Sequence, residues 1–356
     1  MAIVETTGVT PLGTQDLQHT GAVSRWVSRH GAILILGVLL VILPAIASDF
    51  ILVQVAGWAM ILGIIALSLM FLAGYGGMVS LAQMTVAGVS GYMITVFGAS
   101  SLPAISLFWP WWVAAPIAIG IAVAFGTLTG VLASRTEGIY TIMITLAIAA
   151  AFFYLTLQNW PIFNGFAGFT TIPAPVAFGI NWKHPVPLYY LILFFAALSY
   201  IVVVYISRSP FGLALQGVRD NPRRMEAIGY NVTAHRIASF AFAALIASIG
   251  GILMVWLNNQ ISPGSNGIEA TIDLLVIAVV GGLGHPIGAF VGAIIYVILR
   301  TFALDALVAV GLDGRRFQTL IGLGFLVIVL FSPDGVIGLW RRWVARAHTS
   351  GGRTNH

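Results

Sequence analysis

Residues 208–236 read RSPFGLALQGVRDNPRRMEAIGYNVTAHR, a long polar stretch in an otherwise apolar sequence. Two strongly apolar runs flank it, Leu188–Ile206 and Ile237–Leu257. It holds five of the sixteen Lys and Arg residues of the chain, namely Arg208, Arg219, Arg223, Arg224 and Arg236. A polar, helix-compatible segment of this length between two apolar runs indicates a surface that contacts another protein. The simpler alternative is an ordinary basic loop.

Local signals within this stretch predict one short helix. Asp220 or Asn221 can cap its amino terminus, and Pro222 suits the first helical position. Helix-forming residues follow until Gly229, which can end the helix. We therefore expect a helix over residues 221–230, exposed to water and carrying both acidic and basic side chains.

Composition places the chain in a membrane. Of its 356 residues, 59% are hydrophobic and 8% are charged, whereas soluble domains carry about 25% charged residues. Several apolar runs approach or exceed the ~20 residues that an α-helix needs to cross ~30 Å of hydrocarbon. The absence of cysteine excludes disulfides, thiolate metal sites and a cysteine nucleophile. The net charge of +5 fits basic residues at the cytoplasmic ends of spans, so nucleic acid is not an expected partner.

The apolar runs predict an all-α polytopic membrane protein with about ten transmembrane segments, some of them short or broken. These segments are Gly31–Ala47, Leu52–Ala73, Val79–Ala99, Trp111–Ala133, Gly138–Leu157, Leu188–Ile206, Ile237–Leu257, Ile272–Gly284, Ile287–Leu304 and Phe317–Phe331. The turn Gly281–Gly284 overlaps the end of the eighth segment, so we expect a broken or kinked helix pair there. The expected organisation is a cytoplasmic tail at 1–30, a transmembrane domain at 31–340 with a cytoplasmic loop at 207–236, and a cytoplasmic tail at 341–356.

The distribution of Lys and Arg predicts the orientation of the spans. Cytoplasmic termini place most basic residues inside, including the whole polar stretch and the Arg341–Arg342 pair. Only Lys183, Arg315 and Arg316 then fall outside. The external loop at 158–187 is rich in aromatic residues and proline. It suits an aromatic belt at the membrane interface, a lid above a translocation pathway, or both.

Three separated motifs resemble the branched-chain amino-acid ABC-importer permeases, specifically the LivM-type subunit. The polar stretch carries the first at Arg208, Ser209, Phe211, Gly212, Arg219, Asp220, Asn221, Glu226, Ala227, Gly229, Asn231, Val232 and Thr233. A second motif lies at Gly74, Tyr75, Gly77, Val79, Ser80 and Leu81. The third is the turn Gly281–Gly284, followed by Ile287 and Gly288. Together the resemblance covers roughly residues 35–340.

The resemblance implies a subunit of an ATP-driven importer in the bacterial inner membrane. Its implied partners are a homologous second permease, two cytoplasmic ATPase subunits and a periplasmic solute-binding protein. The residues implied to couple to the ATPases are Gly212, Arg219, Asp220, Asn221, Arg223, Arg224, Glu226, Ala227, Gly229 and Asn231. A phosphate-binding loop needs a lysine, and the only lysine is Lys183. We therefore expect no cofactor on this chain, with ATP and Mg used by the partner ATPases.

The sequence indicates the solute and its pathway less specifically than it indicates the partners. We expect the glycine-interrupted segments to line the pathway, at Gly74, Tyr75, Gly77, Ser80, Gln83, Gly282, Gly284 and His285. Close packing of small residues explains the first of these segments equally well. Branched-chain amino acids are the favoured solute, and urea, amides and aromatic acids are the alternatives that relatives of the same architecture suggest.

Ionisable residues near the span ends leave a different transport mechanism open. Glu269 and Asp273 lie one helical turn apart, and Arg300 and Asp305 flank the end of another span. Charged groups within spans are expensive and often functional, so an ion-coupled secondary transporter is one alternative. The simpler explanation of the acidic pair is a helix amino terminus, where carboxylates meet the helix dipole favourably. An integral-membrane enzyme is disfavoured because nucleophiles, bases and metal ligands are not clustered in the sequence.

Overall fold

A computed structural model of the chain describes residues 37, 39–100, 102–103, 105–172, 174–177, 180–309, 322, 335–336 and 338. Two compact units divide the chain, Met1–Ser48 and Asp49–His356. In the first, residues 39–46 are helical. The predicted tails at 1–30 and 341–356, and nearly all of the predicted span Phe317–Phe331, lie outside the described residues. The rest of this description concerns the second unit.

Helices dominate the second unit. The long helices are α4 (Trp111–Ala133), α5 (Ile139–Gln158), α7 (Pro185–Arg208), α10 (Val232–Asn258) and α12 (Pro286–Ala309). A further long helical segment, Ile51–Tyr75, contains α2 (Trp58–Met70). The π-helical turns η1 (Ile51–Gly57) and η2 (Phe71–Tyr75) extend α2 at both ends. Shorter helices are α3 (Gln83–Phe97), α6 (Trp160–Phe163), α8 (Pro210–Asp220), α9 (Pro222–Ala227) and α11 (Ile268–Gly281), with the 3-10 turns η3 (Gly165–Ala167) and η4 (Pro263–Asn266).

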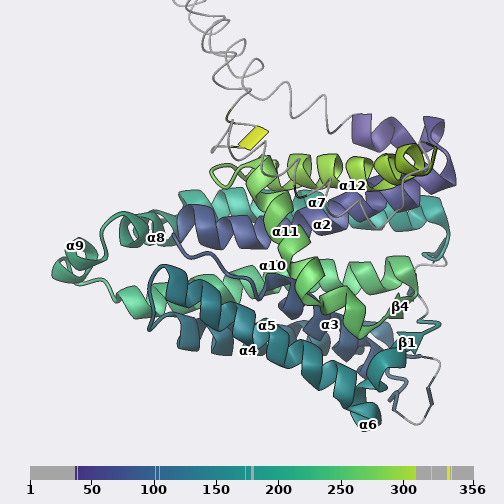
Figure 1. Cartoon of the computed structure of the whole chain (residues 1–356), viewed down its shortest axis with the longest axis horizontal. Helices are drawn as coiled ribbons and strands as arrows, with labels where there is room; N and C mark the ends of the chain where they lie inside the picture. The colour runs from purple at the N-terminus through teal and green to yellow at the C-terminus, as the bar shows by residue number, and fades with distance from the viewer. Residues whose placement is uncertain are drawn as a thin grey trace, which may run out of the picture. The chain divides into compact units, whose positions relative to one another are not determined.

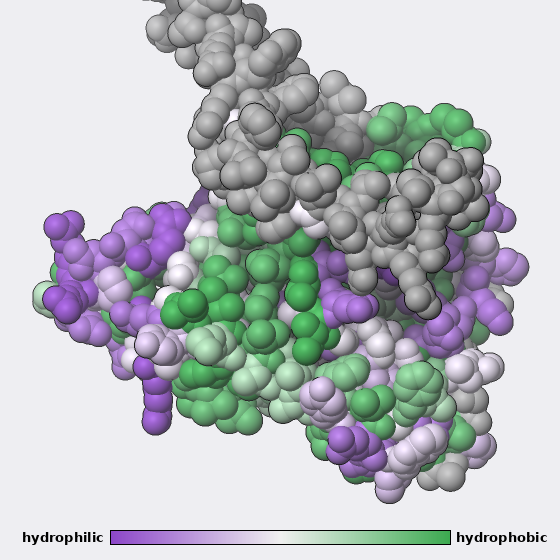
Figure 2. Space-filling view, in the orientation of Figure 1, coloured by the Kyte–Doolittle hydropathy of each residue, from purple (hydrophilic) through white to green (hydrophobic). Residues whose placement is uncertain are grey.

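The long helices form an inner and an outer group. In the apolar 18-residue window of each helix, 83% of the residues of Ile51–Tyr75 and 78% of those of α10 are buried inside the protein. The corresponding share is 28% in each of α4, α5 and α7. The outer helices nevertheless carry large apolar side chains on their exposed faces, including Leu128, Leu132, Tyr140, Met143, Phe194, Ile201 and Tyr205. Such faces suit contact with lipid hydrocarbon, and Figure 2 shows the apolar band that they help to form. The predicted class, an all-α polytopic membrane protein, is confirmed.

The predicted count of about ten spans is not confirmed. Among the described residues, five helices are long and apolar enough to cross a membrane, or six if the bent pair of α11 and α12 counts as one span. The predicted break in this pair is confirmed, because the chain bends by 118° between Gly281, where α11 ends, and Pro286, where α12 begins.

The predicted third span, Val79–Ala99, is wrong in its length. Its helix, α3, begins at Gln83 and has 15 residues, which corresponds to about 22 Å at ~1.5 Å per residue. Gly77, at φ +68°, ends the preceding helical turn and sends the chain through a non-helical segment. There the Leu81 amide donates to Thr145 Oγ1 of α5 at 3.1 Å, so a side chain takes the place of a helical carbonyl.

Small residues hold α3 at the centre of the unit. Gly251 of α10 lies so close to the Ala87 carbonyl that a Cβ atom at this position would overlap it. Ser90 Oγ donates to the Ser248 carbonyl of α10 at 2.9 Å, which joins the two helices across the same contact. Small residues at helix interfaces permit this approach of backbones in membranes.

The two ends of the unit differ in structure. In Figure 1, α8 and α9 project at one end, and α6, β1 (Phe169–Thr170) and β4 (Gln260–Ile261) lie at the other. β1 pairs with β4 antiparallel, which ties the aromatic loop at 158–187 to the end of α10. A second pair, β2 (Val176–Ala177) and β3 (Ile180–Asn181), lies within that loop. Phe163 of the loop is buried 5.2 Å from the Tyr92 ring, whereas Trp160 and Phe166 are exposed.

Candidate functional site

The polar stretch folds into two short helices where one was predicted. Ser209 begins α8, because its hydroxyl accepts a hydrogen bond from the Gly212 amide at 3.3 Å and Pro210 occupies the first turn. Gly212 is buried, and a Cβ atom there would overlap the Ile206 carbonyl. Gly212 therefore shapes the tight turn from α7 into α8, and a partner protein cannot reach it.

The second helix, α9, matches the predicted helix in its start and is shorter at its end. Asn221 caps it, since its Oδ1 accepts a hydrogen bond from the Arg224 amide at 3.0 Å. Asp220, the other predicted cap, pairs with Arg219 Nε at 2.8 Å instead. The helix ends at Ala227, and Gly229 follows at φ +97°, a conformation that favours glycine.

Asn231 has a role that the sequence analysis did not assign to it. Its Oδ1 accepts a hydrogen bond from the Ala234 amide at 2.9 Å, so α10 begins at Val232 and not at the predicted Ile237. His235, in the first turn of α10, stacks on the Phe211 ring at 5.7 Å and meets the Tyr230 ring at 5.5 Å. These three rings join the starts of α8 and α10 and fix the loop after α9.

Most of the residues predicted to couple to a partner lie on the surface. Nine of the ten are exposed, Gly212 being the buried one. Large apolar side chains are exposed among them, with Leu213 at 61%, Ile228 at 66% and Tyr230 at 43%. We call the exposed residues of Leu213–Asn231 the coupling surface, after the coupling residues that the sequence predicts there. Its mixture of basic, acidic and apolar groups suits contact with another protein better than contact with lipid.

Arg219 connects the coupling surface to the transmembrane helices. Its guanidinium Nη1 donates a hydrogen bond to the Gly74 carbonyl in η2. Its aliphatic carbons also lie against Gly77, where a Cβ atom would be 2.5 Å from Arg219 Cγ. On its other side, Gly74 packs against the Leu283 carbonyl in the break between α11 and α12. The structure thus brings together residues from all three sequence motifs.

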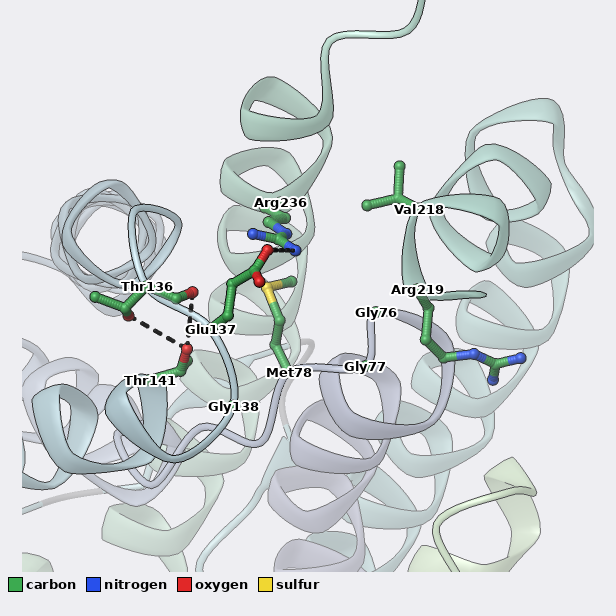
Figure 3. Close-up of a pocket in the computed structure, with 10 residues that line it drawn as sticks. All are labelled: Gly76, Gly77, Met78, Thr136, Glu137, Gly138, Thr141, Val218, Arg219 and Arg236. Atoms are coloured by element: carbon green, nitrogen blue, oxygen red, sulfur yellow. Dashed lines mark hydrogen bonds and ion pairs between the residues drawn. The ribbon is translucent and has the colours of Figure 1, made fainter. Parts of the chain in front are cut away.

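A small cavity of about 110 Å³ lies beside this contact. Its lining residues are Gly76, Gly77, Met78, Thr136, Glu137, Gly138, Thr141, Val218, Arg219 and Arg236. Arg236 Nη2 pairs with Glu137 Oε1 at 3.2 Å, the Arg side chain being 13% exposed and the Glu side chain 74%. Figure 3 shows the Arg219 side chain directed away from this ion pair. The ion pair therefore links the start of α10 to the α4–α5 turn, separately from the Arg219 contact.

The predicted pathway residues form a buried polar group and a group in the two glycine-rich segments. Ser80 and Gln83 are buried, and the Ser68 hydroxyl donates to Gln83 Oε1 at 3.1 Å, which makes them part of the packing between α2 and α3. Gly77 lines the small cavity. Tyr75 and His285 are partly exposed, Gly284 is exposed, and Gly282 is buried at φ +102° in the break.

Most of the chain matches known proteins in sequence. A family model described as "Branched-chain amino acid transport system / permease component" matches residues 51–330. LivM, the high-affinity branched-chain amino acid transport system permease of Salmonella typhimurium, is 25% identical over 302 residues, 78% of this chain and 66% of that protein. The Escherichia coli LivM protein matches to the same extent.

Relatives from other organisms are matched as well. A probable branched-chain amino acid transport permease LivM of Methanocaldococcus jannaschii is 25% identical, over 62% of this chain and 67% of that protein. The ribose import permease RbsC of Haemophilus influenzae is 21% identical, over 71% of this chain and 78% of that protein. No solved structure matches the chain. With its family model matched over most of its length, the chain belongs to the family of branched-chain amino acid transport system permease components.

Proposed function

We propose that this chain is the transmembrane permease subunit of an ATP-driven importer, which moves branched-chain amino acids from periplasm to cytoplasm by alternating access. The observation that carries the proposal is the coupling surface, which projects from the helices in a chain of this family. A second, homologous permease, two ATPase subunits and a periplasmic solute-binding protein complete the transporter. ATP and Mg are bound by the ATPases, and this chain binds no cofactor.

The contacts of Arg219 support a route by which movement of the ATPases reaches the spans. An ATPase that pushes on α9 also moves α8, because Met225 of α9 packs against Gly217 of α8. Arg219 of α8 holds the Gly74 carbonyl, and Gly74 packs against Leu283. Displacement of α8 therefore acts on η2 and on the break between α11 and α12, where the chain bends by 118°.

Orientation follows from the same proposal. The ATPases are cytoplasmic, so the α8–α9 end lies in the cytoplasm and the β1–β4 end faces the periplasm. This agrees with the concentration of arginine in residues 208–236. The proposal also keeps both termini cytoplasmic, on the distribution of basic residues in the sequence.

Two exposed isoleucines at opposite ends of the unit provide the test. Ile228, on the coupling surface, is 66% exposed, and Ile162 of α6 is 48% exposed. The complete transporter is purified through a tag on this chain carrying either Ile228→Asp or Ile162→Asp. We expect Ile228→Asp to lose the ATPase subunits and leucine uptake, because the added charge would be desolvated in the interface. Ile162→Asp should retain the ATPases.

The outcome for uptake separates the alternatives. Leucine uptake that continues without the ATPase genes and collapses with a proton uncoupler would replace this proposal with the ion-coupled secondary transporter. Uptake that depends on the ATPases, with urea, an amide, an aromatic acid or another solute preferred to leucine, would keep the mechanism and change the solute.

A further inference from the structure

A larger cavity, of about 330 Å³, lies at the opposite end of the helices from the coupling surface. It is lined by Trp58, Leu62, Met84, Met254, Asn258, Ser262, Gly264, Ser265, Glu269, Ala270, Asp273, Tyr296 and Arg300. These residues come from α2, α3, α10, η4, α11 and α12. Sites for small molecules typically measure about 300–1,000 Å³, so this cavity has room for a small solute.

One wall of the cavity is apolar. Leu62, Met84 and Met254 are buried in the protein and Trp58 is partly exposed, so the wall is a fixed part of the helix packing. Methionine adapts its shape to different apolar groups more readily than branched residues do. This wall suits an aliphatic side chain of moderate size.

The charged residues of the lining carry both signs of charge. Glu269 and Asp273 lie one turn apart on α11, and Tyr296 and Arg300 lie one turn apart on α12, all four facing the same cavity. The Tyr296 hydroxyl interacts with both the Asp273 carboxylate and the Arg300 guanidinium. Groups of both signs are therefore near the phenol.

The two charges do not neutralise each other directly. Among the side chains that the structure describes, the ion pairs within 4.0 Å are Arg219–Asp220 and Arg236–Glu137, and neither involves this cavity. Glu269 and Arg300 are exposed and Asp273 is partly exposed. Acidic and basic groups that line one cavity without pairing with each other are available to bind a ligand that carries both charges.

We propose that this cavity is a binding site for a zwitterionic amino acid, and this inference rests on the function proposed above. Arg300 binds the carboxylate of the solute, with the Tyr296 hydroxyl as a second donor. Asp273 and Glu269 bind its ammonium group. The aliphatic side chain packs against the methionines and Leu62. The cavity lies at the end that faces the periplasm, so it receives solute from that side.

This site differs from the pathway that the glycine motifs predicted. None of Gly74, Tyr75, Ser80, Gln83 or His285 lines the cavity. The glycines lie near the coupling surface, where they transmit movement, and the charged residues near the other end select the solute. Sequence analysis noted these charges and could not place them around one cavity, because α11 and α12 face each other only after the chain bends by 118°.

The test measures binding of radiolabelled leucine to the purified complex of this chain with its permease and ATPase partners, without the binding protein. Leucine amide, which lacks the carboxylate, and isocaproate, which lacks the amine, are the competitors. We expect the unmodified complex to bind leucine more tightly than either analogue. Arg300→Ala should weaken leucine binding about 10- to 100-fold, the effect of losing a charge-assisted hydrogen bond, and leave leucine amide unchanged. Asp273→Asn should weaken leucine and leave isocaproate unchanged.

Two controls separate this inference from misfolding and from the proposed function. Arg135→Ala removes an exposed arginine near the other end and should leave leucine binding unchanged. Stimulation of ATPase activity by the binding protein should persist in each variant that is correctly assembled. The inference is overturned if the unmodified complex shows no saturable leucine binding, or if Arg300→Ala weakens leucine and leucine amide equally. ATP-independent uptake by the unmodified transporter would instead overturn the proposed function.

Discussion

Arg219 of α8 donates a hydrogen bond to the backbone carbonyl of Gly74, which lies 145 residues earlier in the chain. Because the acceptor is a backbone atom at the end of η2, a shift of α8 displaces the helix itself and not only a side chain. The Leu283 carbonyl packs on the other side of Gly74, so the same glycine also touches the break between α11 and α12. This arrangement makes Arg219 the first residue to alter when the coupling is tested.

Replacing Arg219 should uncouple ATP hydrolysis from transport. Arg219→Ala removes the hydrogen bond to Gly74, and we expect leucine uptake to fall at least several-fold while the ATPases remain bound. The ratio of ATP hydrolysed to leucine transported, measured in proteoliposomes, reports this directly. Arg135→Ala is the control, because Arg135 is also an exposed arginine and lies outside the coupling surface. Equal loss of transport in both variants would contradict the assigned role.

A second prediction concerns the packing of α3 against α10. Gly251→Ala forces a Cβ atom into the Ala87 carbonyl, and we expect a loss of stability of about 1–3 kcal/mol, as in other overpacked cores. Gly120→Ala in α4 is the control, because its Cβ meets no atom within 4 Å. That substitution should be neutral or stabilising by up to ~1 kcal/mol, since alanine favours helix more than glycine does. Thermal unfolding in detergent measures both.

The ion pair between Arg236 and Glu137 should make a modest contribution to stability. Glu137→Gln leaves the mostly buried guanidinium without its charged partner, but Glu137 itself is 74% exposed. We therefore expect a loss of about 0.5–1 kcal/mol, in the range of exposed pairs. A double-mutant cycle with Arg236→Gln isolates the interaction. A coupling energy near zero would show that the pair does not stabilise the α4–α5 turn.

The Asn221 cap allows the stability of α9 to be tested locally. Asn221→Ala removes the acceptor of the Arg224 amide and should cost about 1 kcal/mol locally, whereas Asn221→Asp keeps a capping oxygen and should behave like the unmodified chain. Hydrogen exchange of the α9 amides should accelerate in the alanine variant only. Similar exchange in the two variants would mean that the helix is held by its contacts with α8 and not by its cap.

The single lysine tests the proposed orientation. Lys183 is exposed between β3 and α7, at the end away from the coupling surface. A membrane-impermeant amine reagent added to spheroplasts should therefore modify Lys183, and Lys183→Arg should abolish this labelling. Modification of Lys183 only after the membrane is opened would reverse the orientation. Mass spectrometry of the labelled peptide distinguishes the two.

Local chemistry allowed part of this structure to be predicted. Asn221, Pro222 and Gly229 carry strong helix start and stop signals, so α9 was located to within a few residues. The break after Gly281 was likewise predicted from glycine and proline. Hydropathy could not distinguish burial in lipid from burial in protein, however. The segment containing α3 therefore resembled a full span, although the polar Ser80 and Gln83 at its start indicated a shorter helix.

The larger cavity lay beyond prediction for a different reason. Its lining comes from segments far apart in the sequence, including α2, which carries Leu62, and α12, which carries Arg300. No local pattern records that these helices pack together. The role of Asn231 was missed more narrowly. Its place two residues after Gly229 suggested the end of one helix, whereas it caps the start of the next.

The shortness of α3 has a consequence for how the chain enters the membrane during synthesis. Insertion machinery releases apolar segments of ~20 residues into lipid one by one, and α3 has only 15 residues with Gln83, Thr85, Ser90 and Thr95 among them. It cannot partition alone. Its two main partners are α4, which follows it directly, and α10, which is synthesised much later. The packing of α3 within the protein is therefore complete only after α10 has been synthesised.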